Sequence, residues 1–466
     1  MTSTQIKTAA HSVRHVPETQ ETPHVPLSAE KRRLFAAAHL ALTSQLKSQS
    51  QQIHRWFVPG RLEFMGKHTD YCRGRSILGA IDRGFCFCVS PRQDSRLRIL
   101  DAENGLNADL DISASSVTTQ HKDWTVYPAT VARRLAGMSP VPIRGADVAF
   151  ISDLPPAAGL SSSSCLIVGI YLALARSNAD IFTTHNIALP HDPLALGDFL
   201  GCIESGRPWR KHSGDKGVGT HGGSQDHTAI LCSLPGQLTE FDFYDSCSIT
   251  SVALPSHLTF AIAVSGVSAH KTGSAGAAYN QVSRRATTCV QMWNSFSHRN
   301  EDCLEALFRS GPESLHVARR ALMEQKSEEF SLPLLLSRLE QYDAECHVLI
   351  PAAMAAMRRG NWMELGRIVD ESQRLAETCL HNQVPQTQHL AASARRLGAV
   401  AASAFGAGFG GAVWALVEKA HANAFIRRWQ ENYNSEFHIQ SRNASFFTTT
   451  LGLPASELSP IEPVTT

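Results

Sequence analysis

The sequence predicts an α+β protein with two domains, and three observations lead to this prediction. The chain has 466 residues, which is more than one ordinary hydrophobic core accommodates. Strand-like segments such as "ADVAFISDL" and "LTFAIAVSGV" are mixed with helical segments such as "SCLIVGIYLALA" and "ALGDFLGCIESG". The two kinds interleave without the regular βαβ alternation of a parallel sheet, so α+β is the better class.

In chain order, residues 1–28 are rich in Thr, Ser, His and Pro, and this composition predicts a disordered tail. A helix is expected to begin after Ser28, a residue type that caps helix N-termini. We expect residues 29–257 to form the first domain and residues 258–466 the second. The last third is helical in pattern and closes with the strand-like "AVWALV".

Composition favours a small-molecule partner. Lys and Arg total 43 against 42 Asp and Glu, and this balance gives no electrostatic basis for binding nucleic acid or an anionic membrane.

Eleven cysteines occur without C-x-x-C pairs, so reduced thiols in the cytoplasm are the simplest interpretation. No apolar run reaches the roughly 18 residues of a membrane span.

The segment "GRLEFMGKHTDYCRG", residues 60–74, mixes residue types that rarely occur together. Its apolar residues alternate as in a strand, yet Arg61, Lys67 and Asp70 suit neither an ordinary core strand nor an ordinary surface loop. The segment is therefore a candidate functional site.

A second candidate is "DLPPAAGLSSSSCLIVGIYLALA", residues 153–175, in which four serines precede an apolar helix. The free N–H groups and the dipole of a helix N-terminus bind anions, and small residues let a phosphate approach the backbone. An ordinary N-cap needs only one serine. The sequence therefore predicts a phosphate site, although no Walker A pattern is present. The candidate residues are Pro156, Ala158, Gly159, Leu160, Ser161, Ser162, Ser163 and Ser164.

Two further segments contain clustered glycines. In "SAFGAGFGGAVWALV", residues 403–417, the G-x-G-x-x-G spacing lies between two strand-like runs; a dinucleotide site needs a helix after the glycines, so a tight hairpin near a ligand is expected. In "GTHGGSQDHTAIL", residues 219–231, Asp226 follows flexible glycines. An acid there can orient and deprotonate a hydroxyl, and a helix cap is the ordinary alternative.

Together these segments resemble the GHMP kinase superfamily and, within it, the galactokinases. "GRLEFMGKHTDY" looks like the galactokinase signature, "PPAAGLSSSS" is similar to the superfamily's phosphate loop, and "FGAGFGGAVWALV" is similar to its third glycine motif. The resemblance covers roughly residues 50–420. It implies two α+β domains with the active site between them, and an ATP-dependent kinase acting on the anomeric hydroxyl of a monosaccharide, with Mg²⁺ bound alongside ATP.

The resemblance also implies roles for individual residues. Arg61 would stabilise the transferring phosphate, and Asp226 would be the catalytic aspartate that accepts the proton of the sugar's anomeric hydroxyl. Ser163 would bind Mg²⁺ together with Glu204, although an insertion at 207–220 separates Glu204 from Asp226. The residues implied in sugar binding are Lys67, His68, Asp70, Tyr71 and Gly408, the last together with Gly410 through its backbone.

Departures from the family pattern leave the sugar open. Lys67 stands where the family has a glutamate, and a lysine can only donate hydrogen bonds. It would bind a neutral sugar or the carboxylate of a uronic acid, or else turn away from the substrate. Galactose is the first expectation; uronic-acid, fucose, arabinose and heptose 1-kinases remain alternatives. A non-catalytic sugar sensor is a further alternative, but the phosphate loop carries no insertion and Asp226 is present. The oligomeric state stays open, and a monomer is compatible with the sequence.

Overall fold

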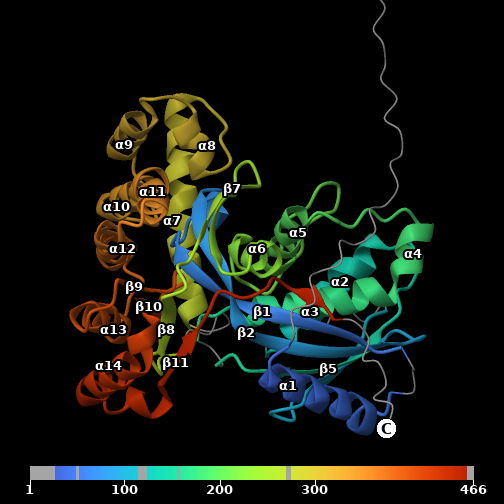
Figure 1. Ribbon diagram of the computed structural model, residues 1–466. Coiled ribbons are helices and arrows are strands. Elements are labelled where there is room, and N and C mark those ends of the chain that lie inside the picture. Colours follow the sequence, from blue (N-terminus) through green and yellow to red (C-terminus); the bar gives the residue numbers. More distant parts are fainter. Residues whose placement is uncertain (1–26, 49–51, 114–122, 156–157, 269–273, 459–466) are drawn as a thin grey trace, which may run out of the picture.

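The computed structural model describes residues 27–48, 52–113, 123–155, 158–268 and 274–458. Most of the predicted tail, residues 1–26, and the predicted ATP-binding Pro156 lie outside the described residues. Two β-sheets organise the described part of the chain (Figure 1), one of eight strands and one of four. The α+β class predicted from the sequence is confirmed.

The larger sheet has the strand order β12-β1-β2-β5-β3-β4, and β6 pairs with both β2 and β7. Strands β1 and β2 form its long antiparallel centre, and β3 runs parallel to β5. The strands are β1 (His54–Met65), β2 (Arg75–Pro91), β3 (Arg96–Asp101), β4 (Asn107–Asp111), β5 (Ala146–Ser152), β6 (Gln237–Asp242), β7 (Cys247–Ala253) and β12 (Ser456–Glu457).

Helices cover both faces of this sheet. Neighbouring residues of β1 point to opposite sides of the sheet, and apolar residues on each side pack against a helix. Phe57 packs in the cluster that contains Phe35 of α1, and Val58 packs in the main core with α3. Ser28 caps α1 as predicted, accepting a hydrogen bond from the Lys31 amide at 3.1 Å. The helices are α1 (Ala29–Leu40), α2 (Val126–Met138), α3 (Ser162–Ser177), α4 (Ala179–Thr184), α5 (Pro193–Ser205) and α6 (Gln225–Cys232).

Helix α3 begins within the serine run, at Ser162, and its residues after Ser164 are mostly apolar, since the helix is buried against the sheet. Its approach to β2 is close: a Cβ at Gly169 would lie 2.2 Å from the ring of Phe87. This contact fixes where the N-terminus of α3 lies relative to β1 and β2.

The smaller sheet is antiparallel with the order β11-β8-β10-β9. The glycine-rich segment turns from β9 directly into β10, so the predicted hairpin is present and no helix follows the glycines. The strands are β8 (Leu258–Val264), β9 (Ala401–Ala404), β10 (Ala412–Glu418) and β11 (Ser445–Thr449).

The helices of the second half of the chain lie on the left of Figure 1. They are α7 (Ser274–Ser297), α8 (Leu304–Arg309), α9 (Ser314–Glu324), α10 (Leu332–Asp343), α11 (Ile350–Arg358), α12 (Trp362–Leu375), α13 (Pro385–Arg396) and α14 (Ala422–Glu436). Of these, α12, α13 and α14 pack against the smaller sheet. A π-helical turn, Ala344–Leu349, continues α10 into α11. Among the described helices, none combines the length and the hydropathy that a membrane crossing needs.

The two sheets share one hydrophobic core. Phe64 of β1 stacks on Trp414 of β10 at a centroid distance of 4.5 Å and meets Phe260 of β8 edge-on. The predicted domain boundary at residue 257 falls between β7 and β8, but the chain returns at its C-terminal end, where β12 pairs with β1. The last described strand therefore belongs to the first sheet and not to the second domain, in which we expected it.

Candidate active site

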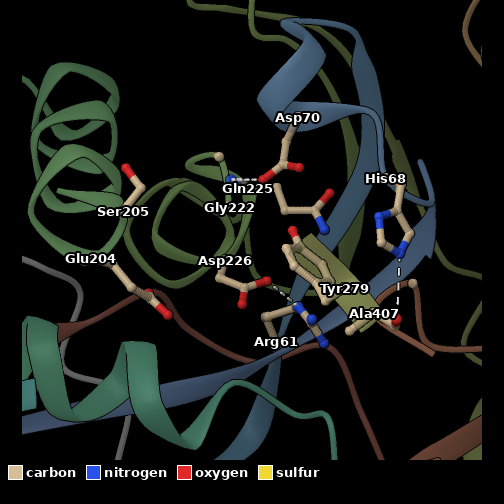
Figure 2. A pocket seen from close by; sticks show the side chains of 12 residues that line it. Arg61, His68, Asp70, Glu204, Ser205, Gly222, Gln225, Asp226, Tyr279 and Ala407 are labelled. Atoms are coloured by element: carbon tan, nitrogen blue, oxygen red, sulfur yellow. Dashed lines mark hydrogen bonds and ion pairs between the residues drawn. The ribbon is translucent and has the colours of Figure 1, made fainter. Parts of the chain in front are cut away.

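A pocket lies where the end of β1, the start of α6, helix α7 and the β9–β10 hairpin meet (Figure 2). Its walls contain three of the four segments singled out in the sequence, and the fourth, the serine loop, adjoins them through Arg61 and Glu204. The lining residues are Arg61, His68, Asp70, Glu204, Ser205, Gly222, Gly223, Gln225, Asp226, Tyr279, Gly406 and Ala407.

An ion pair between Arg61 and Asp226 crosses the pocket floor. Arg61 Nε donates to Asp226 Oδ1 at 2.8 Å, and Arg61 Nη1 donates to the carbonyl of Gly159 in the serine loop. Only 3% of Arg61 is exposed. Burial opposes the charge of the guanidinium, but Asp226 and then Glu63 outweigh it and raise the pKa of Arg61. The guanidinium is therefore a fixed positive charge between the serine loop and the pocket.

The serine loop presents the N-terminus of α3. Ser161 is in the left-handed region at φ 66°, and its buried Oγ has no hydrogen-bond partner among the described residues. Gly159 also has a positive φ, 76°, and the Leu160 carbonyl accepts a hydrogen bond from the Arg61 amide at 3.3 Å. Ser162 and Ser163 are half-buried at the first turn, where a helix has free N–H groups. This arrangement suits a phosphate.

Three oxygen-bearing side chains converge below the loop. Ser164 Oγ donates to Glu204 Oε2 at 3.1 Å and lies 3.4 Å from Asp226 Oδ2. We expected Ser163 to be the partner of Glu204; the hydroxyl that reaches Glu204 is that of Ser164, because consecutive helical residues point about 100° apart. A metal-binding role for Ser163 stays a prediction.

The opposite wall contains a carboxylate whose hydrogen bonding is incomplete. Asp70 Oδ2 accepts from the Gln225 amide at 3.3 Å, whereas the buried Oδ1 has no hydrogen-bond partner among the described residues. Burial, and then the neighbouring charge of Asp226, raise the pKa of Asp70. Gly223 is needed beside it, since a Cβ there would lie 2.4 Å from Asp70 Oδ2.

His68 lines the pocket as a neutral ring. Burial and the nearby guanidinium of Arg338 lower its pKa to about 3. Nδ1 lies 2.9 Å from the hydroxyl of Tyr71, and Nε2 lies 3.3 Å from the carbonyl of Ala407. Tyr71 does not line the pocket; its hydroxyl orients His68, and its predicted contact with the substrate stays a prediction. Both ring nitrogens of His68 are engaged, so a sugar hydroxyl would have to replace one of these partners.

Lys67 does not reach the pocket, contrary to the prediction that it reads the substrate. Its side chain is 1% exposed, and Nζ donates to Ser403 Oγ at 2.7 Å and to Ser372 Oγ at 3.2 Å. Burial lowers the pKa of Lys67. The chain turns at Gly66, where φ is 112°, and this turn directs Lys67 toward α12 and β9.

Gly408 does not line the pocket, and its predicted backbone contact with the sugar stays a prediction. At φ 70° its missing side chain faces Asn382, whose carbonyl oxygen would lie 2.1 Å from a Cβ there. The hairpin residues that line the pocket are Gly406 and Ala407.

The sequence matches known families in three places. Residues 44–91 match the galactokinase galactose-binding signature, residues 126–191 the GHMP kinase N-terminal domain, and residues 353–435 the GHMP kinase C-terminal domain. The chain is a GHMP kinase. The resemblance predicted from the sequence motifs is thereby confirmed.

Several curated relatives of this GHMP kinase are named galactokinase. One from a Roseiflexus species is 26% identical over 408 residues, which cover 84% of this chain and 92% of the relative. One from Glaesserella parasuis is 26% identical over 388 residues, covering 82% and 90%. The crystal structure of Lactococcus lactis galactokinase complexed with galactose has a similar fold, with a TM-score of 0.72, 20% identity, and coverage of 91% of this chain and 100% of that one.

Several site residues were not predicted, and three of them carry chemically important side chains. Tyr279 of α7 lines the pocket, and its ring lies 4.8 Å from that of His68. Gln225 lines the pocket beside Asp226, and Glu63 lies behind it and accepts from Gln225 Nε2 at 2.8 Å. Glu63 carries a signal that sequence reasoning could have used, because it is an acid between buried apolar residues of a strand.

Proposed function

We propose that this GHMP kinase is a galactokinase, which transfers the γ-phosphoryl group of ATP to the anomeric hydroxyl of galactose. The observation that carries the proposal is the buried Arg61–Asp226 pair, which lies between a helix N-terminus suited to phosphate and the carboxylate of Asp70. The galactose-binding signature and the relatives named galactokinase support the choice of sugar.

Asp226 would receive the proton of the attacking hydroxyl. Its Oδ1 is paired with Arg61, and its Oδ2 faces the Ser164 hydroxyl, so the carboxylate is held in one orientation at the pocket. Phosphoryl transfer passes through a loose transition state, in which positioning and charge neutralisation matter most. Arg61 contributes a charge that cannot be titrated away at any physiological pH.

The donor set below the serine loop fits Mg²⁺. A hydroxyl and two carboxylates are hard oxygen ligands, and Mg²⁺ typically uses one or two carboxylates together with substrate phosphates. No group of three or more His, Cys, Asp or Glu that could hold a metal unaided occurs among the described residues, which suits an ion that arrives with ATP. Glu204 and Ser164 or Ser163 would hold it, and bound Mg²⁺ would neutralise charge on the phosphates.

On the sugar side, Asp70 Oδ1 is the acceptor that a hydroxyl would satisfy, and Tyr279 with neutral His68 would flank the ring. Because Lys67 is buried away from the pocket, the reason to prefer a uronic acid is removed. A neutral sugar matches the lining better.

All eleven cysteines are free thiols, and we infer a cytoplasmic location from this.

A coupled ADP-release assay over galactose, arabinose, fucose, a heptose and galacturonate tests the proposal. We expect galactose to give the highest kcat/KM by at least about tenfold, since an unpaired buried polar group penalises analogues that lack a hydroxyl. A higher kcat/KM for another sugar would replace galactose. No turnover with any sugar, alongside measurable binding of ATP and galactose, would identify a non-catalytic sensor.

A further inference from the structure

Glu63 lies directly behind the pocket, where it contacts three of the lining residues. It follows Arg61 by two positions on β1, so both side chains point to the same face. Glu63 Oε2 accepts from Gln225 Nε2 at 2.8 Å and lies 3.8 Å from Arg61 Nη2. Its other oxygen lies under Gly406, where a Cβ would be 2.0 Å from it. Glu63 is 2% exposed, so it acts on the pocket only through these neighbours.

Behind Glu63 lies the buried ammonium of Lys67. Nζ is held by two serine hydroxyls, and within the described residues no carboxylate comes within 4 Å of it. Glu345 approaches from the other side: its Oε1 accepts from Ser372 Oγ at 3.0 Å and from the Gly66 amide at 2.8 Å. Three buried charges therefore alternate in sign, Glu63, Lys67 and Glu345.

Each of these buried charges depends on an opposite charge nearby, because an isolated buried charge is strongly unfavourable. Glu63 faces Arg61 on one side and Lys67 on the other, and both stabilise its carboxylate. Lys67 in turn depends on Glu345 and Glu63. Glu63 and Lys67 therefore each stabilise the charged form of the other.

We propose that Glu63, with Lys67 behind it, is a positioning residue that holds Arg61 and Gln225 in the geometry needed for phosphoryl transfer. This inference rests on the proposed function. Arg61 is shared between Glu63 and Asp226; without the charge of Glu63 it pairs with Asp226 alone and draws that carboxylate away from the substrate hydroxyl.

Gln225 couples Glu63 to the rest of the site. Its side chain lies between Glu63 and Ser76, whose Oγ donates to Gln225 Oε1 at 3.0 Å. Its backbone amide donates to Asp70, and the next residue is Asp226. A shift of Gln225 therefore moves both the proposed base and a sugar-binding carboxylate, and displacements of about 1 Å can cost 10²-fold in rate.

Four charged groups face Glu63: Arg61, Lys67, Asp226 and Asp70. Burial raises the pKa of Glu63 to about 7, with Arg61 and Lys67 opposing the rise. The carboxylate is charged above this pH and neutral below it. Activity that depends on its charge should fall as the pH drops through about 7, and this decrease should be absent from Glu63→Gln.

The test compares Glu63→Gln, Lys67→Met and the double variant, with galactose and MgATP as substrates. Glu63→Gln removes the charge of residue 63, and Lys67→Met removes a cation that favours its charged form, so we expect kcat to fall about tenfold or more in both, with a smaller rise in the galactose KM. The double variant should be no slower than the slower single. Asp147→Asn, which removes a buried carboxylate paired with Arg92 and Arg98 away from the site, is the matched control and should leave kcat unchanged.

A kcat for Glu63→Gln within twofold of the wild type, or independent, multiplicative losses in the double variant, would overturn the inference. Thermal unfolding provides a readout that does not depend on turnover. The Tm of the double variant should equal or exceed the Tm of each single variant. Each single change leaves one buried group without its charged partner, whereas the double change removes both charges. Additive losses of Tm would show that Lys67 does not support Glu63. A wild type that binds galactose and ATP without turnover would overturn the proposed function, and the Tm comparison would still show whether Lys67 supports Glu63.

Discussion

Replacing Asp226 with asparagine removes the proposed base and changes little else. In the wild type Arg61 Nε lies 2.8 Å from Asp226 Oδ1, and the amide oxygen of an asparagine can accept the same hydrogen bond. Glu63, 3.8 Å from the guanidinium, is unchanged. Stability should therefore fall by about 1–3 kcal/mol, less than the 3–5 kcal/mol of a buried ion pair that loses one partner outright.

The effect on catalysis should be larger and confined to kcat. General acid–base catalysis contributes about 10²–10⁴-fold, so we expect Asp226→Asn to lower kcat by at least ~10²-fold, about 2.7 kcal/mol in the activation barrier. The dissociation constants of ATP and galactose should change less than about threefold, because the phosphate loop and Asp70 are untouched.

The assay is steady-state ADP release, with both dissociation constants measured by calorimetry. Asp242→Asn is the control: it removes a buried carboxylate that pairs with Arg309 at 2.8 Å outside the pocket, and it should retain the wild-type kcat. A kcat for Asp226→Asn within threefold of the wild type would remove Asp226 from the mechanism.

Four further changes test other parts of the site. Glu204→Ala should raise the Mg²⁺ concentration for half-maximal rate, because one oxygen ligand is lost; an unchanged Mg²⁺ dependence would reject Glu204 as a ligand. Asp70→Asn should raise the galactose KM by about 10–100-fold, the worth of a hydrogen bond to a charged group, and leave the ATP KM unaltered. Gly223→Ala should also raise the galactose KM, since its Cβ would meet Asp70; a wild-type KM would contradict the crowding. Lys67→Glu should lower the Tm and gain no activity on galactose, because a third acid would join two buried acids; a stable variant with increased galactose turnover would return Lys67 to the substrate site.

Much of this site could be predicted because its chemistry is local in the sequence. Four serines before an apolar helix indicate a phosphate site, and an acid after glycines indicates a base. The hairpin of β9 and β10 followed from the absence of a helix after the glycines. These inferences need only the residue types and the element that follows them.

The remaining features depend on where the backbone turns and which helical face is presented. Lys67 follows a positive φ at Gly66, and this turn buries it instead of directing it into the pocket. Ser164 lies beside Glu204, where we expected Ser163, because consecutive residues of a helix point about 100° apart. Tyr279 comes from α7, far away in the sequence, and β12 joins β1 only after the chain has completed the second sheet. Contacts of this kind are set by packing between distant segments.

Identification of the product tests the central claim most directly. The wild-type chain is incubated with galactose and MgATP, and ³¹P NMR follows the phosphorylated sugar while ADP is measured in parallel. The account predicts one sugar phosphate for each ADP, with the phosphorus coupled to the anomeric proton, and no product from Asp226→Asn on the same timescale. Phosphate on any other sugar position, or ADP formed without a sugar phosphate, would contradict it.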